Sequence, residues 1–393
     1  MHPDPALPAP AATGSAWWLA TAALGFGAGG AAGLGWYYSS LLMDPAQRPI
    51  YPERVLAADA DTVTLATTRL TGQPGVWGLR WPQGLAVIGP IEAGDSGTDR
   101  IVRRRLAGPV PLAGTAAAID AGPYDPDPGA RGLAHEDVPV PTPLGDCSAW
   151  YVPASGDTWV LLVHGRGGSR REALRVLPAL HEAGHPALVV TYRNDPEAPP
   201  SPDGRYHLGD TEWADLEAAV CWARDRGARR VVLFGWSMGA AIIGAFLDRS
   251  AEAGAVAAVV WDCPLLDWRE TLRQQARNRR LPASLTALAT TATSRRIGID
   301  FDRFDLLRRP PAVRPPTLIV HSTEDTVVPV GPSRRLAAVA PRLDWPIRFR
   351  EVPGVEHTGS WNADPAGYER AVVGFLDEVL DGHHRQRAGT MDR

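Results

Sequence analysis

The sequence predicts an α/β protein in which, over residues 134–382, helices cover both faces of a mostly parallel sheet. Short apolar runs alternate along this region with longer amphipathic stretches, and such strand–helix alternation is typical of parallel sheets. Glycine-rich or charged segments directly follow several of the runs. Because parallel sheets bind ligands at the carboxyl ends of their strands, we expect functional residues at these positions.

The amino-terminal segment Ala16–Met43 has the properties of a membrane-spanning helix. No charged residue lies between Asp4 and Asp44, and the segment exceeds the roughly 20 residues that a bilayer-spanning helix needs. Aromatic residues lie near both ends, at Trp17 and over residues 36–38, as in the aromatic belts of membrane helices. The segment therefore predicts a transmembrane anchor, with a cleaved signal peptide or a soluble leader as alternatives.

The charges around this segment bear on the choice and on orientation. Residues 1–15 carry no positive charge, whereas a secretory signal peptide has a positively charged start. This favours a leader and transmembrane anchor over residues 1–43. Arg48 and Arg54 follow the segment and no arginine precedes it, so the positive-inside rule predicts a single-pass membrane protein whose large C-terminal part is cytoplasmic.

Residues 44–133 are predicted to form a small β-rich module that ends in a linker. The stretch Asp61–Thr68 alternates and is rich in β-branched residues, and glycine, proline and aspartate separate further short runs. The charge run Arg103 to Arg105 is interpreted as the solvated end of a strand, with a membrane-surface or substrate contact as the alternative. We find no catalytic constellation here. The other predicted strands are Gly75–Trp81, Gly84–Ile91 and Arg100–Leu106, and the linker covers residues 121–132.

The elements of the α/β region follow in chain order, each apolar run taken as a strand and each longer amphipathic stretch as a helix. The predicted strands are Trp159–Val163, Ala187–Tyr192, Arg230–Gly235, Val256–Trp261, Thr317–His321 and Ile347–Val352. The predicted helices are Ser169–Ala183, Thr211–Arg226, Met238–Ala253, Trp268–Arg280, Pro282–Arg296, Ser333–Val339 and Pro365–Leu380, followed by a polar tail over residues 383–393.

A nucleophile elbow is the most specific motif. The apolar run that ends at Phe234 is followed by Gly235-Trp-Ser237-Met-Gly239 and then by a helix, which is the strand–turn–helix context that a G-x-S-x-G motif requires. The tight turn exposes the serine oxygen, and the two glycines leave room for strand and helix to approach each other. Ser237 is thus the candidate nucleophile.

A glycine-rich segment, His164-Gly165-Arg166-Gly-Gly, follows an earlier strand. Acyl transfer develops negative charge on a carbonyl oxygen, which fixed backbone N–H groups stabilise. We expect the N–H groups of Arg166 and Met238 to form this oxyanion hole, and His164 to shape the loop. The Arg166 side chain is expected to point to solvent or to contact a carboxylate or phosphate of the substrate.

Two further strands are followed by a carboxylate and by a histidine. Asp325 is the candidate acid that orients an imidazolium, with Asp262 and the neighbouring Glu324 as competitors. His357 lies between the last strand and the final helix, where it can accept the serine proton and return it to a leaving group. The chain order Ser237, Asp325, His357 is the order of the Ser-Asp-His triad on such folds.

With these motifs, residues 134–382 resemble the α/β-hydrolase superfamily and, within it, serine-aminopeptidase-like and esterase-like bacterial hydrolases, some of which carry an N-terminal membrane segment. The resemblance implies the α/β-hydrolase fold, a serine acyl-enzyme, and a helical cap inserted over residues 265–313. It also implies an esterase, lipase, thioesterase or peptidase. The matching pieces are Asp137–Gly145, Ala149–Pro153, His164-Gly165, Gly235–Gly239, Glu324-Asp325, Val328-Pro329 and His357.

We therefore predict a serine hydrolase that cleaves an ester, thioester or amide, with carboxylic esters favoured and a small-molecule or lipid-like acyl substrate. An acyltransferase or peroxidase on the same fold, or a non-catalytic interaction protein, are the alternatives. The chain has no lysine, which excludes Schiff-base chemistry, and its three cysteines include no CxxC pair. We expect neither a cofactor nor a metal site, and a net charge of −4 gives no reason to expect nucleic acid as a partner.

Overall fold

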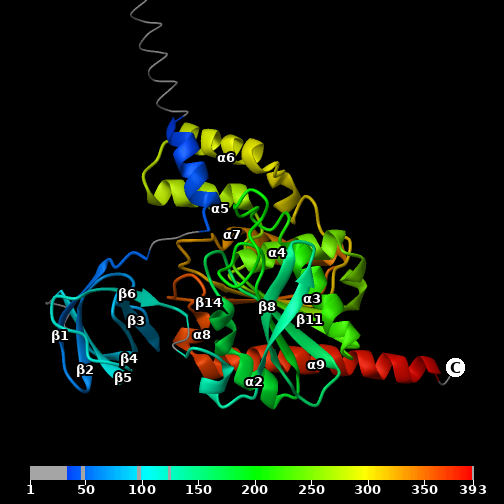
Figure 1. Ribbon diagram of the computed structural model, residues 1–393, viewed down its shortest axis with the longest axis horizontal. Helices are drawn as coiled ribbons and strands as arrows, with labels where there is room; N and C mark the ends of the chain where they lie inside the picture. The colour runs from blue at the N-terminus through cyan, green and yellow to red at the C-terminus, as the bar shows by residue number, and fades with distance from the viewer. Residues whose placement is uncertain (1–32, 46–48, 95–98, 123–124, 392–393) are drawn as a thin grey trace, which may run out of the picture.

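The structure is a computed structural model that describes residues 33–45, 49–94, 99–122 and 125–391. Figure 1 shows a small β-barrel beside a larger α/β domain, and a helical cap above that domain. The predicted β-rich module is thus present as a barrel, and the predicted α/β architecture is confirmed.

The barrel closes because its first strand pairs with both the second and the last strand, in the order β1-β2-β5-β4-β3-β6. Closure removes the exposed strand edges of an open sheet. Its core contains Val55, Leu65 and Trp77. The predicted strands correspond to β2 to β5, whereas β1 and β6 were not predicted. The bounds are β1 Glu53–Ala58, β2 Thr62–Ala66, β3 Trp77–Trp81, β4 Gly84–Gly94, β5 Arg100–Ala107 and β6 Ala116–Asp120.

The interpretation of Arg103 as part of a solvated strand end is wrong. Its side chain is fully buried, with an exposed fraction of 0%, whereas the neighbouring Arg104 is exposed and pairs with Glu92. The Arg103 guanidinium donates to four backbone carbonyls within the barrel. A strand alternates its side chains between two faces, so one residue of this charge run points inward.

The α/β domain has an eight-stranded sheet in the order β14-β13-β12-β11-β9-β10-β8-β7. Only the pairs that include β8 are antiparallel, and the remaining pairs are parallel. The bounds are β7 Glu136–Thr142, β8 Gly145–Val152, β9 Thr158–Val163, β10 Ala187–Val190, β11 Arg230–Trp236, β12 Val256–Asp262, β13 Thr317–Ser322 and β14 Ile347–Val352.

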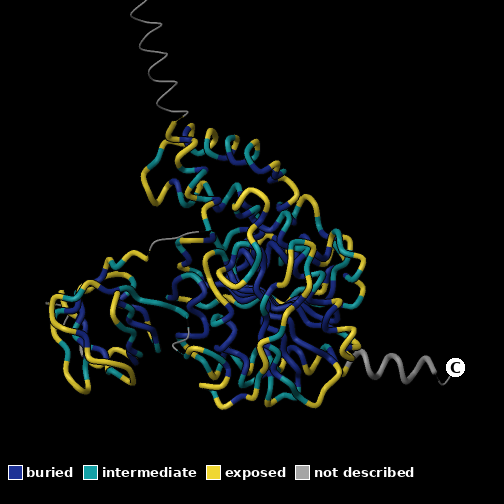
Figure 2. Tube along the Cα trace, in the orientation of Figure 1, coloured by how far each residue is buried: buried dark blue, intermediate teal, exposed yellow. Residues whose placement is uncertain are grey.

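Two hydrophobic cores lie on the two faces of this sheet. In the fully buried β9, Leu161 belongs to one core and Val160 and Leu162 belong to the other. Helices α3 and α4 contribute to the first core, and α2 and α9 contribute to the second. Figure 2 shows the buried residues of the domain interior in dark blue. The helices are α2 Leu177–Glu182, α3 Trp213–Asp225, α4 Met238–Arg249, α7 Gly331–Val339, α8 Ser360–Ala363 and α9 Pro365–Met391.

The single helix predicted over Ser169–Ala183 is divided into a 3₁₀ helix, η2 Arg170–Arg175, and α2. Pro178 lies in the first turn of α2. Proline lacks an N–H group and clashes with the preceding turn, so it starts a helix more readily than it continues one. The remaining 3₁₀ helices are η1 Pro128–Arg131, η3 Ala251–Ala255, η4 Phe301–Phe304 and η5 Ala340–Leu343.

The cap consists of α5 Trp268–Asn278 and α6 Ala283–Ile297, and a helix over residues 33–43 packs against it (Figure 1). The buried hydroxyl of Ser39 accepts a hydrogen bond from Thr293 Oγ1 at 3.0 Å. The guanidinium of Arg296 lies 3.9 Å from the ring centre of Trp36. These contacts join the amino-terminal helix to α6.

The predicted single-pass membrane location is contradicted. Within the parts of the chain that the structure describes, no helix combines the length and the apolar character needed to cross a bilayer. Residues 16–32 of the predicted span lie outside the described residues. Within residues 33–43, Met43 is buried in the core of the α/β domain, and Gly35 lies against Leu288 of α6.

Candidate active site

Ser237 lies in a sharp turn between β11 and α4. Its backbone has φ 52° and ψ −115°, a conformation that is strained for a residue with a side chain. Close packing dictates glycine on both sides of it. A Cβ on Gly235 would lie 2.7 Å from Ile243 Cδ1, and one on Gly239 would lie 2.2 Å from the carbonyl oxygen of Val163.

We expect Gly239→Ala to lower the free energy of unfolding by about 1–3 kcal/mol, because the added methyl group overlaps the backbone of β9. Gly374→Ala in α9 is the matched control, since nothing lies within 4 Å of its added Cβ and alanine favours helix. Urea denaturation of both variants measures the difference. Equal stability of the two variants would contradict the packing described here.

The side chains of Ser237, His357 and Asp325 meet at the carboxyl ends of β11, β14 and β13. His357 Nε2 lies 2.9 Å from Ser237 Oγ, and His357 Nδ1 lies 2.6 Å from Asp325 Oδ2. The imidazole of His357 is therefore within hydrogen-bonding distance of both the Ser237 hydroxyl and the Asp325 carboxylate.

The Asp325 carboxylate is held from both of its oxygens. Oδ1 accepts the backbone N–H groups of Val327 and Val328, each at 2.7 Å, and Oδ2 faces His357. Burial alone would raise the pKa of Asp325, but the charge of His357 and hydrogen bonds from His321 and His357 outweigh it, so the pKa lies well below its usual range. The carboxylate is ionised and fixed in orientation.

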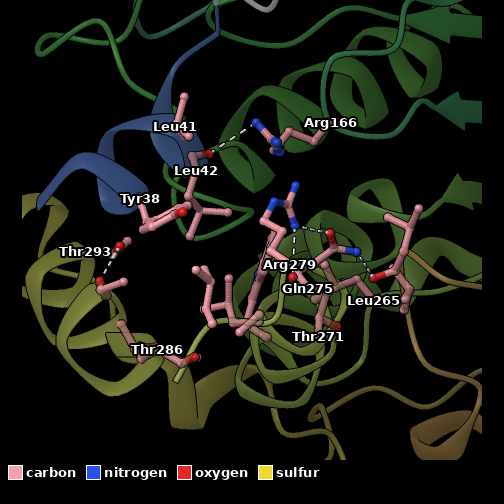
Figure 3. Close-up of a pocket in the computed structure, with 18 of the residues that line it drawn as sticks. Tyr38, Leu41, Leu42, Arg166, Leu265, Thr271, Gln275, Arg279, Thr286 and Thr293 are labelled. Atoms are coloured by element: carbon pink, nitrogen blue, oxygen red, sulfur yellow. Dashed lines mark hydrogen bonds between the residues drawn. The ribbon is translucent and has the colours of Figure 1, made fainter. Parts of the chain in front are cut away.

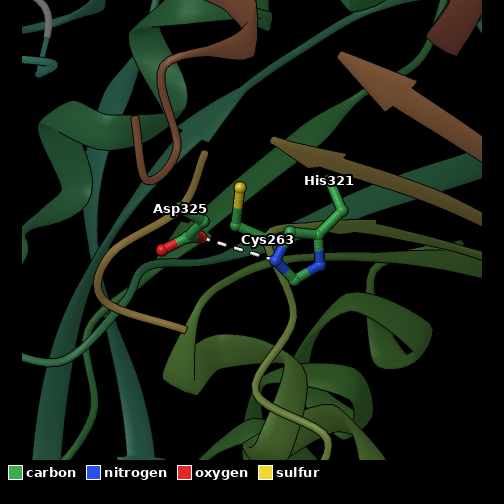
Figure 4. Close-up of side chains that lie close together, drawn as sticks. All are labelled: Cys263, His321 and Asp325. Atoms are coloured by element: carbon green, nitrogen blue, oxygen red, sulfur yellow. Dashed lines mark ion pairs between the residues drawn. The ribbon is translucent and has the colours of Figure 1, made fainter. Parts of the chain in front are cut away.

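A buried cluster of Cys263, His321 and Asp325 surrounds this acid (Figure 4), with one ligand-type atom of each residue within 4.8 Å of the others. The thiol of Cys263 accepts the N–H of Thr358 at 3.2 Å. The two ring nitrogens of His321 lie 2.8 Å from Ser333 Oγ and 3.4 Å from Asp325 Oδ2. Since these donor atoms have protein partners, we interpret the cluster as support for the Asp325 carboxylate.

The two competing acids lie elsewhere. The carboxylate of Asp262 accepts the hydroxyl of Tyr368 at 2.8 Å, and burial raises its pKa. The side chain of Glu324 is exposed. The structure thus brings Asp325, rather than Asp262 or Glu324, to the imidazole.

The glycine-rich segment runs beside the serine. A Cβ on Gly165 would lie 3.1 Å from Ser237 Cβ, so the backbone leading to Arg166 passes directly next to the candidate nucleophile. Met238 is the first residue of α4, where helix N–H groups lack carbonyl partners within the helix. His164 contacts Asp195 Oδ2 at 2.9 Å and the carbonyl of Gly165 at 2.8 Å, which is a loop-shaping role.

Two charged residues that the sequence analysis does not single out hold this segment and the loop of His357, respectively. Glu172 Oε2 accepts the N–H of Gly165 at 2.9 Å. Arg175 is buried and donates to the carbonyl of Thr358, next to His357, at 2.8 Å. In the sequence both lie in a stretch with several arginines, and no local pattern distinguishes them.

A cavity of about 450 Å³ is lined by Ser237 and His357 together with residues of the cap; Figure 3 shows part of its lining, including Thr271 and Thr286 of the cap. Its lining is mostly aliphatic and aromatic, with threonines and two arginines among the polar residues. Pockets of this size and character accommodate small organic ligands. The lining includes Tyr38, Leu41, Leu42, Arg166, Met238, Leu265, Trp268, Leu272, Arg279, Leu281, Leu285 and Val328.

The Arg166 side chain points into this cavity rather than to solvent. Its Nη1 donates to the carbonyl of Leu42 at 3.3 Å (Figure 3). The backbone carbonyl of Met43 accepts the N–H of Tyr206 at 2.9 Å. The amino-terminal helix is therefore one wall of the cavity and is tied to the loops of the α/β domain.

Two family models match the chain. Residues 202–383 match the prolyl oligopeptidase family, and residues 54–120 match a family described as a domain of unknown function (DUF8805). The second match covers most of the β-barrel, from β1 to β6. The first covers the part of the α/β domain that contains Ser237, Asp325 and His357.

Known proteins resemble the chain at low sequence identity. The uncharacterized protein YfhR of Salmonella typhimurium is 25% identical over 250 residues, which cover 59% of this chain and 77% of that protein, and YfhR of Salmonella typhi matches equally. The esterase Pf2001 of Pyrococcus furiosus superimposes with a TM-score of 0.52 at 20% identity, over 65% of this chain and 95% of that one. The family match and the fold together support a hydrolase, and the larger domain of the chain has the α/β-hydrolase fold.

Proposed function

We propose that this protein is a serine hydrolase that cleaves a carboxylic ester through an acyl-enzyme, with Ser237, His357 and Asp325 as its triad. One observation carries the proposal: the hydrogen-bonded series from Ser237 Oγ through His357 to an ionised, fixed Asp325 opens into an apolar cavity. A nucleophile, a base and an acid that orients the base are the parts that acyl transfer requires.

Acylation begins when Ser237 Oγ attacks the carbonyl carbon of the ester. His357 Nε2 takes the serine proton, and Asp325 stabilises the imidazolium that forms. The carbonyl oxygen becomes an oxyanion, and the N–H groups of Met238 and Arg166 donate to it. When the carbon–oxygen bond to the alcohol breaks, His357 gives its proton to the departing oxygen.

Deacylation repeats these steps with water as the nucleophile. His357 Nε2 removes a proton from water as the water oxygen attacks the acyl carbon. The bond between the acyl carbon and Ser237 Oγ then breaks, and His357 returns the proton to Oγ. The products are a carboxylic acid and the regenerated enzyme, so the reaction consumes one water and needs no cofactor. The apolar lining of the cavity suits an uncharged acyl or alkyl group of a small-molecule or lipid-like ester.

Labelling by a fluorophosphonate probe tests the nucleophile. The serine oxygen should displace fluoride at phosphorus, and mass spectrometry of the digested protein should find the phosphonate on Ser237. Excess of a short-chain p-nitrophenyl ester should slow the labelling. Labelling on another serine, or none on folded protein, would contradict the proposal.

Cleavage of an amide is the second candidate, favoured by the match of residues 202–383 to the prolyl oligopeptidase family. A panel of p-nitrophenyl esters of increasing chain length, together with aminoacyl anilides, separates the two. We expect higher kcat/KM on the esters. If aminoacyl anilides are the better substrates, the peptidase assignment replaces the esterase assignment.

The pH dependence of kcat/KM should show an acid limb above pH 6.5. Burial alone would lower the pKa of His357, but the charge of Asp325 and its hydrogen bond outweigh burial and raise the pKa above the ordinary 6.5. The base works only when neutral, so activity should rise with pH through the raised pKa and fall below it. Rates over roughly pH 5 to 9 report this value for the free enzyme; an acid limb below pH 6.5 would contradict the assignment.

A further inference from the structure

The β-barrel touches the two loops that carry the acid and the base. These loops follow β13 and β14 and hold Asp325 and His357. The barrel segment between β2 and β3, residues 67–76, lies against both. None of its residues is among those that line the cavity, so contact with substrate does not account for this arrangement.

Glu356, the residue before His357, joins the two loops. Its carboxylate accepts the N–H of Thr326 at 3.1 Å and the hydroxyl of Thr326 at 2.9 Å, and Thr326 directly follows Asp325. The same carboxylate accepts the N–H of His357 at 3.2 Å. One buried side chain is therefore bonded to the neighbour of the acid and to the base itself.

The barrel holds Glu356 from its other side. Gln73 Oε1 accepts the N–H of Glu356 at 2.8 Å, and Gln73 is itself buried. Arg69 Nη1 lies 3.1 Å from the Glu356 carboxylate, while Arg69 Nη2 donates to the carbonyl of Glu324 in the acid loop. Two barrel side chains thus contact both loops of the triad.

The buried Arg103 fixes the shape of this barrel segment. Its guanidinium donates to the carbonyls of Thr71 at 3.0 Å, Gln73 at 2.8 Å and Gly75 at 2.7 Å, and its Nε donates to Gly89. A charged group removed from water requires such fixed partners. The fully buried arginine therefore organises the backbone from which Arg69 and Gln73 reach the hydrolase domain.

The barrel also holds the chain on the far side of His357. Val76 and Asn362 exchange two hydrogen bonds, from Val76 N to Asn362 O at 2.9 Å and from Asn362 Nδ2 to Val76 O at 2.8 Å. The ring of Trp77 packs so closely on Gly359 that a Cβ there would lie 2.6 Å from it. The barrel thus contacts the loop of His357 on both sides of this residue in the chain.

We propose that the barrel is a positioning module of the active site, in which Arg69 and Gln73 act through Glu356 to set His357 and Asp325 in line with Ser237. This rests on the proposed function, since it assigns a role in the same acyl transfer. Reactions of this kind lose about a hundredfold in rate for a misplacement of about 1 Å. Loss of the barrel contacts should therefore reduce turnover and leave substrate binding in the cavity intact.

The test compares Arg69→Ala with Arg104→Ala in the full-length protein. Both arginines are on the barrel surface and pair with one carboxylate, Glu356 and Glu92 respectively. We expect Arg69→Ala to lower kcat on a p-nitrophenyl ester by about ten- to a hundredfold with KM within about twofold. Arg104→Ala should keep both constants. Gln73→Ala and Glu356→Gln should resemble Arg69→Ala.

Rates are normalised to active sites counted by the end point of fluorophosphonate labelling, so that unfolded protein does not contribute. A folded Arg69→Ala variant with unchanged kcat would overturn the positioning role, as would a loss that disappears on normalisation or resides in KM alone. Failure of the wild-type protein to label or hydrolyse would instead overturn the proposed function.

Discussion

Replacing Ser237 with alanine should lower kcat/KM for ester hydrolysis by about a million-fold, to the level that binding and the oxyanion donors alone support. Ser237 Oγ is the atom that bonds to the acyl carbon, and its hydrogen-bond partner in the structure is His357 Nε2 at 2.9 Å. Removing the hydroxyl should leave the turn intact, because alanine and serine both carry a Cβ and meet the same strain at a φ of 52°.

Steady-state hydrolysis and fluorophosphonate labelling of Ser237→Ala measure this loss. The matched control is Ser155→Ala, which removes the same atom from an exposed serine in the loop before β9, and it should keep full activity. Circular dichroism checks that both variants are folded. A folded Ser237→Ala variant that still hydrolyses esters within about tenfold of wild type would remove Ser237 from the mechanism.

Asp325→Asn should lower kcat by about ten-thousandfold, because it fixes the wrong tautomer of His357. The oxygen at the Oδ1 position accepts the N–H groups of Val327 and Val328, so the amide must keep its own oxygen there and turn its NH₂ group toward His357. The imidazole Nδ1 then has to accept a hydrogen bond. Its proton moves to Nε2, which can no longer take the proton of Ser237.

Glu324→Gln is the control for this substitution, since it neutralises the adjacent carboxylate, which is exposed. We expect its kcat to stay within about twofold of wild type, because the mechanism makes no use of that side chain. Asp325→Asn should also move the acid limb of the remaining activity to lower pH, as burial then dominates the pKa of His357. Equal losses in the two variants would be falsifying for the assignment of Asp325.

The three residues of the proposed triad could be predicted from the sequence because each has a local signature. Ser237 lies between two glycines whose close packing dictates them, and Asp325 and His357 directly follow apolar strands. Parallel strands that end at one edge of a sheet bring such residues together. The mostly parallel sheet could also be predicted, because its strands and helices appear in the sequence as short apolar runs that alternate with longer amphipathic stretches.

Contacts between distant segments had no such signature. Arg69 and Glu356 are 287 positions apart in the chain. The contact between Gln73 and Glu356 spans 283 positions, and the contact between Val76 and Asn362 spans 286. The buried Arg103 donates to carbonyls of β4 and of the segment between β2 and β3, and no local pattern marks these partners. Strands β1 and β6 are short and contain few β-branched residues, so they too lack a strong signature. The predicted anchor includes Tyr38, Leu41 and Leu42, which line the cavity. An apolar, uncharged sequence does not distinguish such residues from those that face lipid.

Residues 33–43 form one wall of the cavity, so the residues that shape the cavity and the residues of the proposed triad lie in different parts of the chain. The three residues of the proposed triad lie within residues 202–383, which match the prolyl oligopeptidase family, whereas Tyr38, Leu41 and Leu42 line the cavity from outside that segment. Substitutions in the wall can therefore change which molecules fit without touching the triad. Selectivity in this protein can diverge among close relatives while their reaction stays the same, and a substrate assigned to one relative transfers to another only if the wall is compared as well.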